Sequence, residues 1–131
     1  MVKLDGNTVM HKIDQEFFFD KGEVGDCVRA VTASILDMDR KDVPHFVKDN
    51  PGHQWYEHWE SFMKNNGIFP HMLTGPWEKV PVPIGYYLAS GPASRGCKHI
   101  VIMENGKLYH DPHPSREGLQ EIEAIWMLLP A

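Results

Sequence analysis

Three residues of the chain are of the types that together make a thiol nucleophile work. Cys27 follows Gly25-Asp26 where an apolar helical pattern begins, so the positive end of the helix dipole would stabilise its thiolate. His99 opens a run rich in β-branched residues, and Asp111 ends the extended segment that follows. A cysteine, a histidine base and a carboxylate that orients the imidazole form a Cys–His–Asp triad by role. These types in this order predict nucleophilic catalysis through an acyl-enzyme.

Two extended segments, 99–103 and 107–111, must bring the histidine and the carboxylate together. Glu104-Asn105-Gly106 separates them, and Asn-Gly between extended runs is a strong hairpin signal. A two-residue Asn-Gly loop would place His99 and Asp111 on opposite faces. A three-residue loop, with its glycine left-handed, would place them opposite each other on one face, about 5 Å apart at Cβ. We predict the three-residue loop.

The same register predicts that Cys97 and His113 share this face, whereas His110 points away. Cys97, His99, Asp111 and His113 could then form a zinc site instead. Four ligands on one flat hairpin face would need another element to complete the coordination sphere. We therefore favour the triad, and we expect no metal and no cofactor. We also expect the thiol at the helix start to be more reactive than the one in the loop.

The chain divides into a helical part, about 26–66, and a sheet part, about 68–129, within one domain, 1–131. Asp26 is the expected N-cap of a first helix that runs from Cys27 to about Leu36. Two further helices are expected at 41–49 and 53–65. Strands are expected at 68–73, 83–89, 99–103, 107–111 and 122–129, after an irregular arm over 1–19 with one short strand. Helices followed by an antiparallel sheet predict the α+β class.

Composition excludes several other classes of protein. The 131 residues carry a net charge of -5, which disfavours nucleic acid and anionic membrane surfaces as partners. Two cysteines are too few for a disulfide framework. No leader-like segment opens the chain and no apolar run approaches the roughly 18 residues that span a bilayer. We expect a cytoplasmic protein with reduced thiols.

The motifs also carry a resemblance. Gly25-Asp26-Cys27 and the apolar helix after it, followed by Asp42-Val43-Pro44-His45-Phe46, resemble the first helix of small papain-like cysteine hydrolases of bacteria and phages. Lys98-His99-Ile-Val-Ile, Gly106 and His110-Asp111-Pro112 are similar to the His and Asp segments of double-glycine leader peptidases. The resemblance implies a papain-like fold with Cys27 as nucleophile, His99 as base and Asp111 as the orienting carboxylate.

One position departs from that family. Its members usually carry a glutamine slightly upstream of the cysteine, where it helps to hold the oxyanion. The nearest upstream glutamine here is Gln15, whereas Lys21 and Glu23 occupy closer positions. Gln15 is therefore the oxyanion candidate, beside the backbone N–H of the nucleophile. Arg95 in a small-residue loop and His113 after the hairpin are the residues expected to line the cleft.

These features favour a thiol hydrolase that cleaves an amide, peptide or isopeptide bond. Its partner would be a peptide, a protein or a small amide, not nucleic acid or a membrane. Two alternatives remain open. One is a catalytically silent papain-like binding protein, such as a phage-encoded inhibitor or adaptor. The other is an acyltransferase that uses the same triad with an amine acceptor. A fold alone does not choose among these functions.

Overall fold

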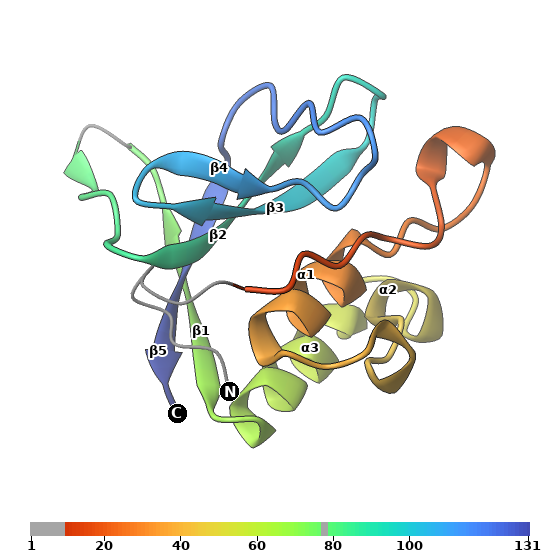
Figure 1. Cartoon of the computed structure of the whole chain (residues 1–131), viewed down its shortest axis with the longest axis horizontal. Helices are drawn as coiled ribbons and strands as arrows, with labels where there is room; N and C mark the ends of the chain where they lie inside the picture. The colour runs from red at the N-terminus through yellow and green to blue at the C-terminus, as the bar shows by residue number, and fades with distance from the viewer. Residues whose placement is uncertain (1–9, 77–78) are drawn as a thin grey trace.

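The protein is an α+β structure in which the helices precede the sheet along the chain (Figure 1). The computed structural model describes residues 10–76 and 79–131. The helices are α1 (Cys27–Leu36), α2 (Phe46–Asp49) and α3 (Gln54–Asn65), with 3-10 turns η1 (Phe19–Lys21) and η2 (Arg40–Asp42). The strands are β1 (Ile68–Thr74), β2 (Tyr86–Pro92), β3 (Lys98–Glu104), β4 (Lys107–His110) and β5 (Ala124–Pro130). The α+β expectation is confirmed.

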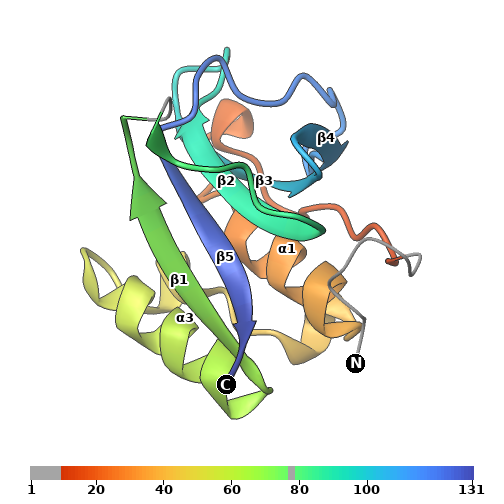
Figure 2. The same cartoon turned by 90° about the vertical axis from the view of Figure 1, so that its left-hand side faces the viewer.

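All strand pairs of the sheet are antiparallel, in the order β1-β5-β2-β3-β4. The last strand lies between the first two, with Leu88 of β2 opposite Trp126 of β5. Figure 2 shows α1 and α3 against one face of this sheet. The strand that follows the helices and the strand that ends the chain therefore lie side by side, and β3 lies next to β2.

The apolar spacing located the first helix correctly, since α1 begins at Cys27 and ends at Leu36. The predicted helix 41–49 is wrong in its first half, which is the turn η2 followed by extended backbone at Val43. The residue before a proline is disfavoured in the helical region, and Pro44 follows directly. Strand β2 begins three residues later than predicted, after Gly85 with its φ of 83°. The expected short strand near the N-terminus is absent from residues 10–19, and 1–9 lie outside the described residues.

The main core lies between α1, α3 and the sheet. The Trp59 indole of α3 is fully buried, donates to Thr32 Oγ1 at 2.9 Å and packs edge-on against Trp126 of β5. Every residue of α1 is buried except Cys27 and Arg29, which are half-buried. Because burial of apolar side chains dominates folding energetics, this core fixes the helix axis. The first residue of α1 thus reaches the edge of the core in a defined position.

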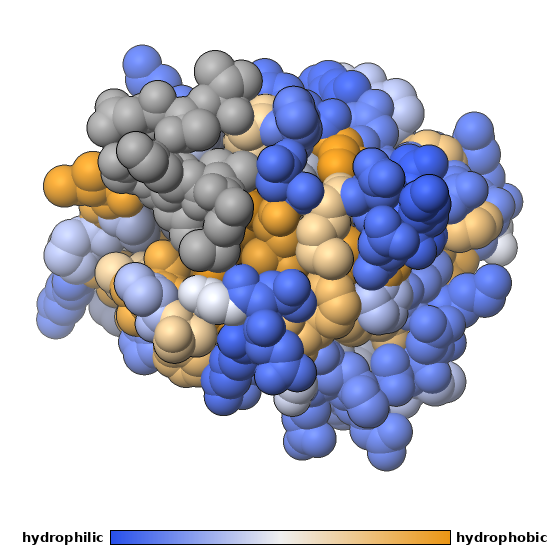
Figure 3. All heavy atoms as spheres, turned by 60° about the horizontal axis from the view of Figure 1, so that its bottom comes forward, coloured by the Kyte–Doolittle hydropathy of each residue, from blue (hydrophilic) through white to orange (hydrophobic). Residues whose placement is uncertain are grey.

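The other face of the sheet carries a smaller apolar cluster. Tyr87 and Val101 are buried there, whereas Tyr86 belongs to the main core, as strand alternation predicts. On the surface, with the bottom of the Figure 1 view turned forward, an apolar area is surrounded by hydrophilic side chains (Figure 3). No helix among the described residues has the length and apolar content needed to cross a bilayer.

Candidate active site

The β3–β4 hairpin turns in two residues, so the predicted three-residue loop is wrong. Glu104 pairs with Lys107, and both turn residues have positive φ, 50° at Asn105 and 86° at Gly106. That combination is typical of the hairpin turn whose twist matches the strands, and Asn-Gly favours it. The Asn105 side chain also accepts a hydrogen bond from the backbone N–H of Gly85 at 2.6 Å. Local turn chemistry therefore determines the loop length.

A β-bulge then corrects the register by one residue. Met103 pairs with Leu108 but Ile102 pairs with His110, so Tyr109 is the additional residue. A bulge shifts every following side chain to the other face. His99 and Asp111 consequently share a face, as predicted, but because of the bulge and not the turn. His99 Nε2 and Asp111 Oδ1 are 2.6 Å apart.

Asp111 is fully buried and accepts three hydrogen bonds. Oδ1 accepts from His99 Nε2 and from the backbone N–H of His113 at 2.9 Å, and Oδ2 accepts from the backbone N–H of Gly118 at 2.8 Å. Burial alone would raise the pKa of this carboxyl, but these donors lower it to about 2. Asp111 is therefore a carboxylate at neutral pH, held in place from both sides.

His99 joins that carboxylate to Cys27. Its ring is almost completely buried, which by itself lowers the pKa of the imidazole. The hydrogen bond to Asp111, then the hydrogen bond to Cys27 and the charges of both groups, raise the pKa to about 9. Since Nε2 is engaged by Asp111, Nδ1 is the nitrogen left for the thiol. This arrangement lets His99 take the proton of a thiol while Asp111 holds the imidazole in place.

Asp26 occupies the N-cap position of α1, as expected, but its side chain binds elsewhere. Its side chain makes no cap hydrogen bond. Instead Oδ1 accepts from the backbone N–H groups of Glu16 and Phe17, at 2.8 and 2.9 Å. The buried carboxylate thus holds the N-terminal segment at the start of α1. Capping preferences, which concern only neighbouring residues, do not predict this contact.

That segment brings Gln15 to the site despite its distance in sequence. Its backbone N–H donates to the Pro112 carbonyl at 3.0 Å, next to Asp111. Its Nε2 donates to the Phe17 carbonyl at 2.8 Å, and a methyl group on Gly25 would lie 3.6 Å from this nitrogen. The side chain is buried, and its Oε1 has no hydrogen-bond partner among the described residues. Gln15 therefore lies against the turn that precedes Cys27.

An ion pair that sequence reasoning missed holds the loop after β4 to the same segment. The Arg116 guanidinium binds both carboxylate oxygens of Asp14, at 2.5 and 2.8 Å, and donates to the Asp111 carbonyl at 2.6 Å. His110 turns away from the triad, as predicted, and contacts the Ile13 carbonyl at 2.8 Å. The two ion-pair residues are 102 positions apart, so no spacing pattern signals them.

The expected cleft residues lie beside the triad. The His113 ring stands edge-on to His99, with centroids 6.4 Å apart, and contacts Ser115 Oγ at 3.0 Å and Asp20 Oδ1 at 3.3 Å. Arg95 donates to the same serine hydroxyl at 3.3 Å. The rim of the site thus consists of polar side chains from η1, from the loop before β3 and from the loop after β4.

The second thiol, Cys97, lies at this rim. Burial raises its pKa, and the charge of Arg95 offsets this only in part, while the charge of Cys27 adds to the rise. The raised pKa of Cys97 agrees with the expectation for this loop thiol, and the difference in reactivity between the two thiols stays a prediction. Cys97 is consequently the natural internal control for the reactivity of Cys27.

The zinc alternative rested on four side chains, two of which are engaged in hydrogen bonds with each other. Within residues 10–76 and 79–131, no three His, Cys, Asp or Glu side chains converge as metal ligands. Both oxygens of Asp111 already accept hydrogen bonds, and His99 Nε2 makes one of them. Two of the four candidate zinc ligands, His99 and Asp111, therefore already bind each other.

Comparison with protein-family models, with curated proteins and with solved structures found no match to this chain. Its function is therefore argued from the site itself.

Proposed function

We propose that the protein is a thiol hydrolase that cleaves an amide, peptide or isopeptide bond through an acyl-enzyme on Cys27. The observation that carries this proposal is the buried His99, hydrogen-bonded to Asp111 at 2.6 Å and close enough to Cys27 for that thiol to raise the pKa of the imidazole. A nucleophile, a base and an orienting group in series are what covalent acyl transfer needs. The helix-plus-antiparallel-sheet arrangement supports a papain-like fold.

The chemistry begins when His99 takes the thiol proton of Cys27 and becomes an imidazolium. The Cys27 thiolate attacks the carbonyl carbon, and the Sγ–C bond forms as the carbonyl becomes an oxyanion. The imidazolium of His99 gives its proton to the departing amine, the C–N bond breaks and the thioester remains. Water then attacks the thioester with His99 as base, which releases the acid and restores the thiol. Asp111 keeps the ring oriented and supports its charge.

Gln15 is the proposed oxyanion donor, together with the backbone N–H of Cys27. One hydrogen of its Nε2 is given to the Phe17 carbonyl, which leaves the second for a ligand. Burial makes such a donor effective, because a preorganised N–H in a dry site costs no reorganisation during the reaction. Gln15→Ala should lower turnover about 10²-fold or more.

Alkylation followed by a turnover screen tests the proposal. We expect iodoacetamide at neutral pH to modify Cys27 faster than Cys97, measured by peptide mass spectrometry. We expect hydrolysis of members of a broad amide and peptide library, lost in Cys27→Ala and retained in Cys97→Ser as the matched control. An inert Cys27, or full activity in Cys27→Ala, would reject the hydrolase. A reactive Cys27 whose acyl group passes only to an added amine would indicate an acyltransferase.

A further inference from the structure

We infer that Arg95 binds a carboxylate of the substrate beside the scissile bond, so that the hydrolase acts on acidic amides. This rests on the proposed function. The chain has four arginines. Arg29, Arg40 and Arg116 each have a carboxylate oxygen within 4.0 Å. Arg95 has none within that distance among the described residues, although it is the arginine at the thiol site.

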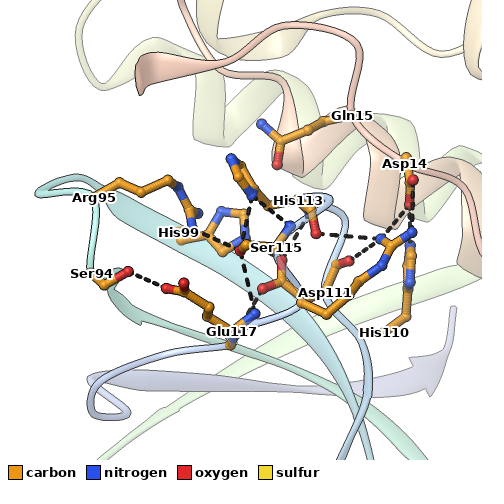
Figure 4. A network of polar contacts seen from close by, with 12 residues as sticks. Asp14, Gln15, Ser94, Arg95, His99, His110, Asp111, His113, Ser115 and Glu117 are labelled. Atoms are coloured by element: carbon orange, nitrogen blue, oxygen red, sulfur yellow. Dashed lines mark hydrogen bonds and ion pairs between the residues drawn. The ribbon is translucent and has the colours of Figure 1, made fainter. Parts of the chain in front are cut away.

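The position of the guanidinium follows from a chain of contacts. Arg95 lies in the short loop between β2 and β3, and its Nη1 donates to Ser115 Oγ at 3.3 Å. That hydroxyl contacts Nδ1 of His113 at 3.0 Å, and the His113 ring stands against His99. Figure 4 shows the Arg95 side chain extending from its loop toward His99. The positive charge is therefore at the rim of the site that holds the reactive sulfur.

The partners that Arg95 has are weak ones for a guanidinium. The side chain belongs to a half-buried residue, its acceptor is the Ser115 hydroxyl, and its charge lies close enough to Cys97 to lower the pKa of that thiol in part. The nearby carboxylate of Asp20 is engaged by His113 at 3.3 Å. A guanidinium prefers the two parallel hydrogen bonds that a carboxylate accepts. A substrate carboxylate is the group that would supply them.

Two alkylating reagents of nearly equal shape isolate this charge without a known substrate. Iodoacetate and iodoacetamide both lose iodide as the thiolate sulfur attacks their methylene carbon, but only iodoacetate carries a carboxylate. The ratio of their rate constants at Cys27 cancels the thiolate fraction, because both reagents meet the same sulfur at the same pH. Peptide mass spectrometry separates Cys27 from Cys97.

We expect Arg95→Gln to lower the iodoacetate-to-iodoacetamide ratio about fivefold at low ionic strength, and Arg95→Lys to keep most of it. Salt should lower the ratio in the unmodified chain and have less effect in Arg95→Gln. Lys64→Gln is the matched control, since it removes a cation on α3 that pairs with Glu60. Its ratio should not change.

The outcomes separate the two proposals. If Cys27 reacts rapidly with iodoacetamide but the ratio is the same in Arg95→Gln, carboxylate recognition by Arg95 is overturned and the hydrolase stands. If Cys27 reacts no faster than Cys97 with iodoacetamide, the hydrolase itself is overturned, and the inference with it. Circular dichroism of both Arg95 variants shows whether the fold is retained, and the salt dependence of the ratio in the unmodified chain provides the measurement if Arg95→Gln does not fold.

Discussion

Two His–Asp pairs lie next to each other in this site and differ in almost every physical respect. His99 and Asp111 are 2.6 Å apart, and their side chains are 2% and 0% exposed. His113 and Asp20 are 3.3 Å apart, and their side chains are 11% and 40% exposed. The first pair joins a strand to the loop after β4, whereas the second joins that loop to η1, which projects from the body (Figure 1).

Two pairs of the same residue types therefore differ in distance and burial, so residue type alone does not assign a chemical role. Asp111 is held by two backbone N–H groups in addition to its histidine, so the buried pair has one geometry and strongly shifted pKa values. His113 donates its backbone N–H to Asp111 and covers the His99 ring. We interpret the rim pair as support for the buried pair.

The largest expected effect separates the two histidines. His99→Ala should slow both turnover and alkylation of Cys27 at neutral pH, with turnover falling about 10³-fold, because the thiol loses its base and the amine its acid. His113→Ala should lower turnover less than about tenfold, since it removes only a cover. Parallel rate measurements on the two variants test this. Equal losses would mean that His113 is itself a base.

A smaller effect is expected from the Asp14–Arg116 ion pair, which holds the loop after β4 to the N-terminal segment. Arg116→Ala removes the donor to the Asp111 carbonyl and the bond to Asp14, which should cost about tenfold in turnover through misplacement of Asp111. Exchanging the charges, Asp14→Arg with Arg116→Asp, restores an ion pair but not the donor to the carbonyl. We therefore expect no recovery in turnover. Full recovery would show that Arg116 only stabilises the fold.

The smallest effect is on thermal stability as a function of pH. His99 has its pKa raised from 6.5 to about 9, so its contribution is complete below pH 6.5 and is lost as pH rises through 9. Asp111 has its pKa lowered from 3.8 to about 2, so its contribution is present above pH 3.8 and is lost as pH falls through 2. The melting temperature should be highest between pH 3.8 and pH 6.5, where both contributions are complete.

Replacing the aspartate of each His–Asp pair by asparagine distinguishes the two pairs in the same melting-temperature profile. Asp111→Asn should flatten both limbs of the melting profile, with changes of about 5 °C. Asp20→Asn should leave the profile unchanged, because its carboxylate is largely exposed and its histidine partner lies at the rim. An unchanged profile in Asp111→Asn would show that the buried pair does not link pH to folding.

The sequence by itself determined the elements that depend on local patterns. Apolar spacing after Asp26 located α1 to the residue, and the β-branched run from His99 located β3 within one residue. The types and order of Cys27, His99 and Asp111 predicted one site, of which the structure shows the hydrogen bond between His99 and Asp111. Short-range periodicity carries this information because each element buries one face against the core.

Only the tertiary structure decided how those residues meet. The Asn-Gly turn, taken alone, places His99 and Asp111 on opposite faces, and the bulge at Tyr109 reverses that result. Tyr109, the extra residue, bonds through its hydroxyl to the backbone of Met10 and packs its ring against Tyr86 at 4.8 Å. Those partners lie 99 and 23 positions away in sequence, beyond the reach of any local pattern. The Asp14–Arg116 ion pair could not be predicted from the sequence for the same reason, since its residues are 102 positions apart.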